Sequence, residues 1–126
     1  MFSLAVDETY QVLLITVSGE LSADDFANAD VLLRPLIKTA QSLDTVIIDL
    51  RSMSGFDMSM EQLIDRARAG PALRGRRHAF VVSDPYFSDI SRLFAEHRER
   101  AGHGATTIVH SLEEAYRVFD INPVFR

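Results

Sequence analysis

The sequence feature that most constrains the fold is the apolar run from Val46 to Leu50, which reads VIIDL. Only Asp49 interrupts the run, so it lacks the strict alternation of a strand with one face in water. Runs of this kind are typical of a central strand that is covered on both faces of a sheet. We therefore expect a sheet with a buried middle strand here, and Ile48 fully buried within it.

The residues after this strand predict a turn and then a helix. Arg51 to Phe56 includes two serines and one glycine, a composition typical of a turn. Asp57 or Ser59 is expected to cap the next helix, and Gln62 lies three residues after Ser59, where it completes a capping box. We expect the functional site near this 51–60 turn.

Strand-like and helix-like segments alternate along the chain. Apolar runs predict strands at residues 2–6, 10–18, 46–50, 78–82 and 105–109. Capping residues precede the expected helices at Ser22, Ser59, Asp84 and Ser111. Pro35 is expected to kink or split the first helix, because its ring displaces a backbone hydrogen bond. The order predicts an α/β fold, a mixed sheet of about five strands, antiparallel at the N-terminal hairpin and then mostly parallel, packed with about four helices.

The composition is that of one globular domain over residues 1–126, with a tail at 122–126 that is expected to fray. The formal net charge of -5 argues against nucleic-acid binding, which needs a basic surface. The absence of cysteine excludes disulfides and thiolate chemistry. No apolar stretch approaches the roughly 20 residues of a membrane span. No signal peptide is recognised at the N-terminus, so we expect a cytoplasmic protein.

Three short motifs stand at matching places in this order of elements. They are Val17-Ser18-Gly19-Glu20-Leu21 before the first helix, Ile48-Asp49-Leu50 in the central strand and Ser111-Leu112-Glu113-Glu114-Ala115 at the start of the last helix. Together they resemble the STAS family in its SpoIIAA-like branch, over roughly Val6 to Phe119. The resemblance implies the family's α/β fold and a regulatory role. The same branch is also compared with lipid-carrying CRAL-TRIO domains, which implies a ligand pocket.

The resemblance also bears on Ser59. In phospho-switched members of the family the turn reads Asp-Ser-Ser-Gly, and a partner kinase phosphorylates the second serine. The matching residues here are Asp57-Met58-Ser59-Met60. Ser59, with Asp57 beside it, is therefore either a phosphoacceptor or only a helix cap. The two methionines place the chain nearer to the SpoIIAA-like branch than to the switched members.

Two further sets of residues are candidates for binding. Phe56, Met58 and Met60 surround the turn; exposed, they form an adaptable apolar interaction surface, and buried, they close the core. A local basic cluster lies on the second helix and the loop after it and consists of Arg66, Arg68, Arg74, Arg76 and Arg77. The candidate anion contacts are Arg51, at the start of the turn, and Arg74, Arg76 and Arg77 of this cluster. A solvated helix face and polar loop explain the same arginines without a ligand.

No catalytic arrangement is visible, so we expect neither an enzyme nor a cofactor. The chain has four histidines, and their spacing is not that of metal ligands, so no metal is expected. His97 is expected at the edge of the core on the third helix, and His103 in water within a glycine-flanked loop.

Two functions follow as hypotheses. The first is a non-enzymatic regulatory or protein-interaction module that binds an unidentified protein partner, or a second copy of itself as a homodimer, through residues 56–63. The second is a carrier or sensor of a small apolar or anionic ligand, lipid-like in character, in a pocket near the 51–60 turn.

Overall fold

The computed structural model describes residues 1–39 and 42–121. The strands in this part of the chain are β1 (Phe2–Asp7), β2 (Val12–Ser22), β3 (Thr45–Asp57), β4 (Arg77–Val81) and β5 (Thr106–Val109). The helices are α1 (Ala23–Thr39), α2 (Met60–Ala69), α3 (Pro85–Arg100) and α4 (Leu112–Val118). The tail that was expected to fray, 122–126, lies outside the described residues.

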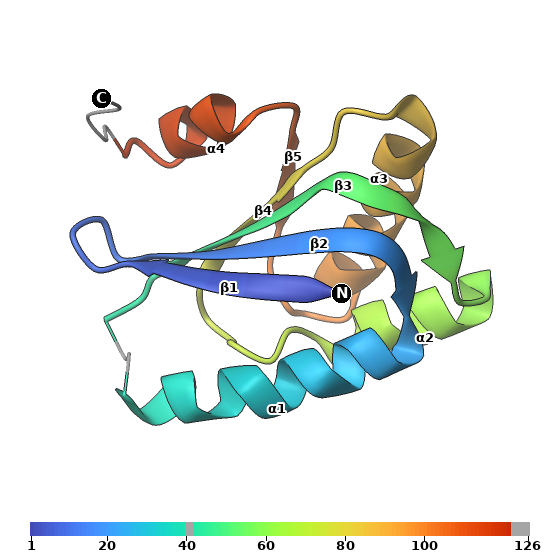
Figure 1. Cartoon of the computed structure of the whole chain (residues 1–126), viewed down its shortest axis with the longest axis horizontal. Helices are drawn as coiled ribbons and strands as arrows, with labels where there is room; N and C mark the ends of the chain where they lie inside the picture. The colour runs from blue at the N-terminus through green and yellow to red at the C-terminus, as the bar shows by residue number, and fades with distance from the viewer. Residues whose placement is uncertain (40–41, 122–126) are drawn as a thin grey trace.

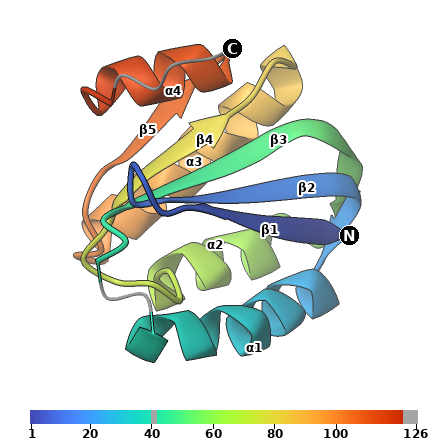
Figure 2. The same ribbon diagram turned by 60° about the vertical axis from the view of Figure 1, so that its left-hand side comes forward.

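Strands that are neighbours in the sheet are also neighbours in the chain, because the sheet order is β1-β2-β3-β4-β5. β1 and β2 pair antiparallel, and the other three pairs are parallel. Parallel strands that step in one direction place their right-handed crossover helices on one face. α1, α2 and α3 accordingly cover one face and α4 the other (Figures 1 and 2). This confirms the predicted mixed sheet with helices packed on it.

The sheet separates two apolar cores. The larger core lies toward α1, α2 and α3 and includes Val46 and Leu50 of β3. The smaller core lies toward α4 and includes Ile47. β3 is therefore buried on both faces, as predicted from its apolar run. The expected full burial of Ile48 is wrong: its side chain is half-buried, because it borders a cavity beneath the helices.

β3 is longer than the sequence suggested. It continues as a strand through Arg51–Phe56, where a turn was predicted, and ends only at Asp57. The reason is its neighbour β2, which also runs on to Ser22, so that the two strands stay paired across two register shifts. Such irregularities bend a strand pair. In Figure 1 the ends of β2 and β3 curve down toward α1 and α2.

The predicted capping residues begin their helices. Asp25 N donates to Ser22 Oγ at 3.2 Å, Tyr86 N donates to Asp84 Oδ1 at 2.8 Å, and Glu114 N donates to Ser111 Oγ at 3.0 Å. The expected split at Pro35 is wrong, since α1 runs through it. Pro35 lies on the exposed side of the helix.

The C-terminal end of α2 is shaped by Gly70 and His103. Gly70 has φ 84° and ψ 172°, a conformation that is open almost only to glycine. The His103 ring lies so close that a Cβ on Gly70 would be 2.6 Å from it. His103 Nε2 also hydrogen-bonds to the Arg68 carbonyl oxygen at 2.8 Å. His103 is thus half-buried against α2, which corrects the expectation that it lies in water.

Candidate functional site

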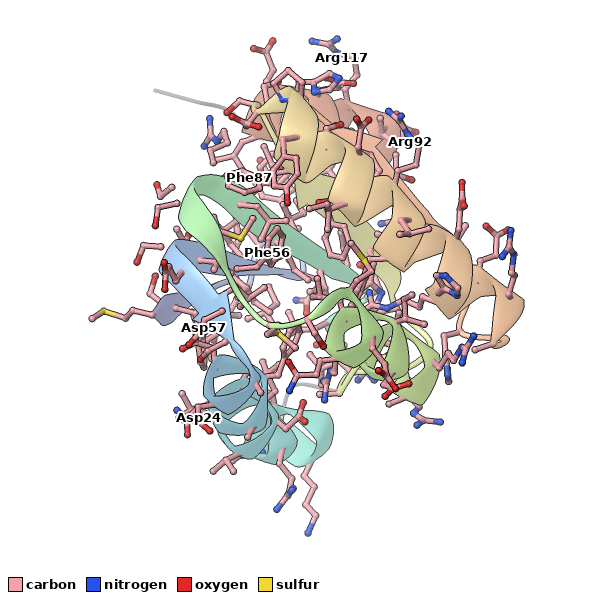
Figure 3. All side chains as sticks on the ribbon, turned by 90° about the vertical axis from the view of Figure 1, so that its right-hand side faces the viewer. Asp24, Phe56, Asp57, Phe87, Arg92 and Arg117 are labelled. Atoms are coloured by element: carbon pink, nitrogen blue, oxygen red, sulfur yellow. The ribbon has the colours of Figure 1, made fainter. Side chains whose placement is uncertain are left out.

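A surface groove lies where the end of β3 meets the first turns of α2 and α3. Its walls are Ser54, Gly55, Phe56, Met58, Met60, Leu63, Tyr86, Phe87 and Ile90. Figure 3 shows Phe56 and Phe87 directed toward each other across this end of the molecule, with Asp57 at the tip of β3. The structure therefore brings the three predicted interaction residues together, and α3 adds two aromatic residues that the sequence analysis did not include.

The groove has a fixed floor and an exposed rim. Phe56 and Met58 are half-buried and pack on the larger core. Phe56 meets Phe87 edge to face, with ring centroids 5.6 Å apart. On the rim, Met60 is 44% exposed and Tyr86 is 65% exposed. The sequence left open whether Phe56, Met58 and Met60 are buried or exposed. In the structure Phe56 and Met58 are half-buried and Met60 is exposed.

Ser59 sits at the start of α2 beside the groove. Gln62 N donates to Ser59 Oγ at 3.1 Å, and Ser59 N donates to Gln62 Oε1 at 2.9 Å. This reciprocal pair is the predicted capping box. Asp57 is instead the last residue of β3 and is exposed, so it does not cap the helix.

Acidic residues border the groove. Asp57 directly precedes Met58, Glu61 directly follows Met60, and Asp84 caps the helix that carries the aromatic rim. All three carboxylates belong to exposed residues. The groove thus combines an apolar centre with an acidic border, an arrangement that attracts basic groups.

The candidate anion contacts are not among the groove residues, and each of them is bonded to other groups of this chain. Arg74 and Arg76 donate to main-chain carbonyl oxygens, at 3.1 Å for Arg74 and at 3.0 and 2.8 Å for Arg76. Arg77 donates to Thr45 Oγ1 at 2.8 Å and lies over the ring of Phe119. These three arginines tie the loop before β4 to its neighbours.

Arg51 lies further along the sheet and is paired with Asp49. Arg51 Nε and Nη2 donate to the two oxygens of Asp49 at 2.9 and 2.8 Å. Burial raises the pKa of the Asp49 carboxyl, but the hydrogen bonds and charge of Arg51 together outweigh it and hold that pKa below its ordinary value. Each of the four arginines is thus engaged by groups of this chain, and their role as anion contacts stays a prediction.

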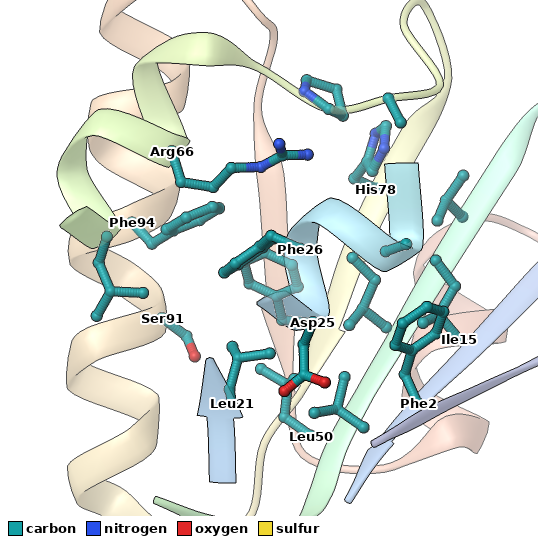
Figure 4. A pocket seen from close by; sticks show the side chains of 18 of the residues that line it. Phe2, Ile15, Leu21, Asp25, Phe26, Leu50, Arg66, His78, Ser91 and Phe94 are labelled. Carbon is teal, nitrogen blue, oxygen red and sulfur yellow. The ribbon is translucent and has the colours of Figure 1, made fainter. Parts of the chain in front are cut away.

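A second candidate site is a cavity of about 120 Å³, partly open to the surface, between the sheet and helices α1, α2 and α3. Its walls are almost entirely apolar and include Ile15, Leu50 and Phe26, seen from close by in Figure 4. Three groove residues, Phe56, Leu63 and Ile90, also line the cavity, so the two sites share a wall.

Arg98 is the unusual residue of the cavity wall. It extends from α3 and is only 4% exposed. Its guanidinium lies over the rings of Phe94 and Phe80, 4.8 and 5.7 Å from their centroids. Its Nε and Nη1 atoms have no hydrogen-bond partner among the described residues. A desolvated cation–π contact contributes about 2 kcal/mol or more, whereas burying a charge costs several kcal/mol.

The neighbouring basic groups leave this charge uncompensated. Arg66 makes two hydrogen bonds of 2.7 Å with Asp30, so that carboxylate is already engaged. Burial, followed by repulsion from Arg66, lowers the pKa of Arg98 to about 10, and the guanidinium stays charged at neutral pH. Burial, followed by the charge of Arg98, lowers the pKa of His78 to about 4, so His78 is neutral.

The other carboxylate of the cavity wall belongs to Asp25 and is held by its own surroundings. Asp25 accepts hydrogen bonds from Ser22 N at 2.9 Å and Ser22 Oγ at 3.1 Å. The bond from the Ser22 main chain is the main cause that lowers the pKa of Asp25. In Figure 4, Asp25 lies away from Arg66 and His78, across Phe26.

His78 makes the stability of the protein sensitive to mild acid. In the unfolded chain His78 takes up a proton at about pH 6.5, whereas in the folded protein it does so only near pH 4. The contribution of neutral His78 to the free energy of unfolding is therefore complete above pH 6.5 and falls as the pH drops toward 4. We expect the free energy of unfolding, measured in urea, to fall by about 2 kcal/mol between about pH 7.5 and about pH 5. In His78→Asn, which does not titrate but can still donate to the Arg76 carbonyl oxygen, this loss should largely disappear. An equal loss in the variant would assign it to other groups.

Arg98 was not predicted from the sequence, although a signal for it was present. His97 was expected at the edge of the core on the third helix, yet Arg98 is four residues after Phe94 and falls on the inner face of α3. His97 is half-buried, as expected of a residue at the edge of the core. An arginine at a stripe position usually extends to water by its long stem, so the pattern alone did not single it out.

Residues 1–39 and 42–121 hold no group of three or more His, Asp or Glu side chains arranged for a metal ion. Within the same part of the chain, no helix has the length and apolar character needed to cross a membrane.

No family model and no curated protein matches the chain. Among solved structures, it is similar to the anti-sigma factor antagonist SpoIIAA in its unphosphorylated form, with a TM-score of 0.62 and 18% identity over 96% of this chain and 100% of that one. It is also similar to an uncharacterized protein with a SpoIIAA-like fold from Shewanella loihica PV-4, of the DUF3478 family. For that protein the TM-score is 0.58 and the identity is 13%, over 93% of this chain and 92% of that one. At these identities the likeness establishes the fold, and it confirms the predicted STAS/SpoIIAA-like architecture.

Proposed function

We propose that this SpoIIAA-like domain is a non-enzymatic regulatory module that binds a protein partner through the groove of β3, α2 and α3. The observation that carries the proposal is the apolar rim of Met60 and Tyr86 over a packed aromatic floor. Exposed methionine and tyrosine side chains are suited to protein contacts, because Met adapts its shape and Tyr is enriched among the strongest contacts of interfaces. The fold gives further support, since it is shared with an anti-sigma factor antagonist.

The acidic border defines the chemistry of the partner. A protein that inserts an apolar side chain into the groove places its neighbouring residues against Asp57, Glu61 and Asp84. Basic residues at those places would be attracted, and acidic ones repelled. We therefore favour a partner segment with an apolar anchor between basic residues. The homodimer remains a prediction, but a two-fold dimer through this groove would bring two acidic borders together.

Site-specific photo-crosslinking tests the groove. A photoreactive amino acid at position 60 in the full chain, expressed in cells of its own source, should capture one discrete partner. The same residue at position 118 is the matched control, because Val118 on α4 is 48% exposed, close to the 44% of Met60, yet lies on the other side of the sheet. Tyr86→Ala should weaken binding of the captured partner, measured with purified proteins, about tenfold or more.

The outcomes separate the hypotheses. Capture from position 60 alone, lost with Tyr86→Ala, supports a partner in the groove. A crosslinked dimer of this chain from position 60 supports the homodimer instead. Equal products from positions 60 and 118, or none from either, would reject the groove as a binding site.

Ser59 fits the same experiment as a proposed switch. A phosphate there would lie at the start of α2 and add negative charge to the border of the groove. The crosslinking is repeated with Ser59→Glu, which mimics the charge of a phosphate, and with Ser59→Ala. If Ser59→Glu still captures the partner, Ser59 has only its capping role. If Ser59→Glu loses capture while Ser59→Ala captures normally, negative charge at Ser59 controls binding.

A second candidate function, carrier or sensor of a small ligand, is favoured by the cavity. The cavity is apolar and shares Phe56, Leu63 and Ile90 with the groove. A ligand inside would therefore contact the wall on which a partner sits, as a ligand-sensing interaction module requires.

A further inference from the structure

We propose that the cavity binds a small apolar molecule that carries one carboxylate, and that this carboxylate contacts Arg98. The inference rests on the second proposed function, ligand binding in the cavity, and is independent of the groove. It adds the chemical class of the ligand and the residue that recognises it.

The demand for a negative group comes from Arg98 itself. Nε and Nη1 lack acceptors, and the residue is 4% exposed. The guanidinium faces the π-electrons of the Phe94 and Phe80 rings, and these rings give its N–H groups no hydrogen-bond acceptor. A carboxylate supplies several acceptor positions and one negative charge, which matches one buried guanidinium.

The surrounding charges argue for a single negative charge on the ligand. Arg66 is engaged by Asp30 through two bonds of 2.7 Å, and His78 is neutral. Arg98 is then the only cation of the cavity wall in the described residues without an acidic partner. A phosphate, with up to two charges, would leave one of them buried and unpaired, and burying such a charge is costly.

The size of the cavity limits the rest of the ligand. Its volume is about 120 Å³, which is close to the roughly 150 Å³ apolar cavity that accepts benzene in another protein. The apolar part of the ligand that the cavity encloses should therefore hold about six carbon atoms. Benzoate and hexanoate meet this limit, one as a flat ring and the other as a short acyl chain.

The test compares each acid with its uncharged alcohol by isothermal titration calorimetry at neutral pH. Wild-type protein should bind benzoate, hexanoate or both at least about tenfold more tightly than benzyl alcohol and hexanol, the effect expected of one charged hydrogen-bonded contact. The acid that binds better identifies a ring-shaped or an acyl ligand. Arg98→Met should abolish the preference for the acid. Arg98→Lys, which keeps the charge, should retain part of it.

Arg92→Met is the matched control on the same helix. Arg92 is exposed and paired with Asp89 at 3.5 Å, so its loss should leave the preference unchanged. Equal affinity for acids and alcohols in the wild type, or a preference that persists in Arg98→Met, would overturn the inference while ligand binding itself stands. If neither acids nor alcohols bind at millimolar concentration, both the inference and the second proposed function are wrong.

Discussion

Replacing Ile47 with alanine should lower the free energy of unfolding by about 2–5 kcal/mol, because it opens a hole in the smaller core. Ile47 is fully buried, and its neighbours across the sheet are Leu14 on β2 and Ala79 on β4. Ala79 is too small to fill the hole left by the Ile47 side chain, and strand pairing on both sides of β3 keeps the backbone from closing it. Urea unfolding at neutral pH measures the change.

Ile48→Ala is the matched control one residue further along β3. Its side chain points to the opposite face and already borders the cavity, so its removal should cost only about 1–2 kcal/mol. Equal losses in the two variants would mean that the cavity is closed in solution and that Ile48 is as tightly packed as Ile47.

Gly70→Ala should cost about 2–4 kcal/mol by the same measurement. The backbone at φ 84° and ψ 172° strains any residue that has a side chain, at about 1–3 kcal/mol. In addition, the new methyl group would lie 2.6 Å from the His103 ring and force it to move. The ring would then lose its hydrogen bond to the Arg68 carbonyl oxygen, worth about 1 kcal/mol.

Gly75→Ala separates the two causes. Gly75 also has a positive φ, 75°, but nothing lies within 4 Å of an added Cβ, so only the backbone strain of about 1–2 kcal/mol should remain. Adding His103→Ala to Gly70→Ala should recover part of the loss by removing the clash. If Gly70→Ala costs no more than Gly75→Ala, the contact with His103 contributes nothing to stability.

Most of the fold could be predicted from local signals. The caps Ser22, Ser59, Asp84 and Ser111 are short-range patterns, and each begins a helix as expected. The extension of β3 through Arg51–Phe56 was not predictable in this way. It depends on pairing with β2, a segment more than thirty residues earlier, whereas serine and glycine favour a turn by themselves.

The candidate site was predicted only in part, for a similar reason. Phe56, Met58 and Met60 are neighbours in the sequence, so their meeting at one place follows from their spacing. Tyr86 joins them from another helix, and Arg98 on α3 meets Phe80 on β4. These contacts depend on tertiary packing, which cannot be predicted from the residue pattern of a single segment.

The strand order also determines how the chain is exposed during synthesis. Each strand pairs with the one made just before it, so the sheet with α1, α2 and α3 can assemble as the chain leaves the ribosome. The face of the sheet that holds Ile47 is covered later, because α4, which packs on it, follows the five strands and the other three helices of the described residues. Until residues 112–118 emerge, this face presents fully apolar side chains to water. We therefore expect the nascent chain to be recognised by chaperones on the α4 side of the sheet, in the interval after β5 is made and before α4 is made.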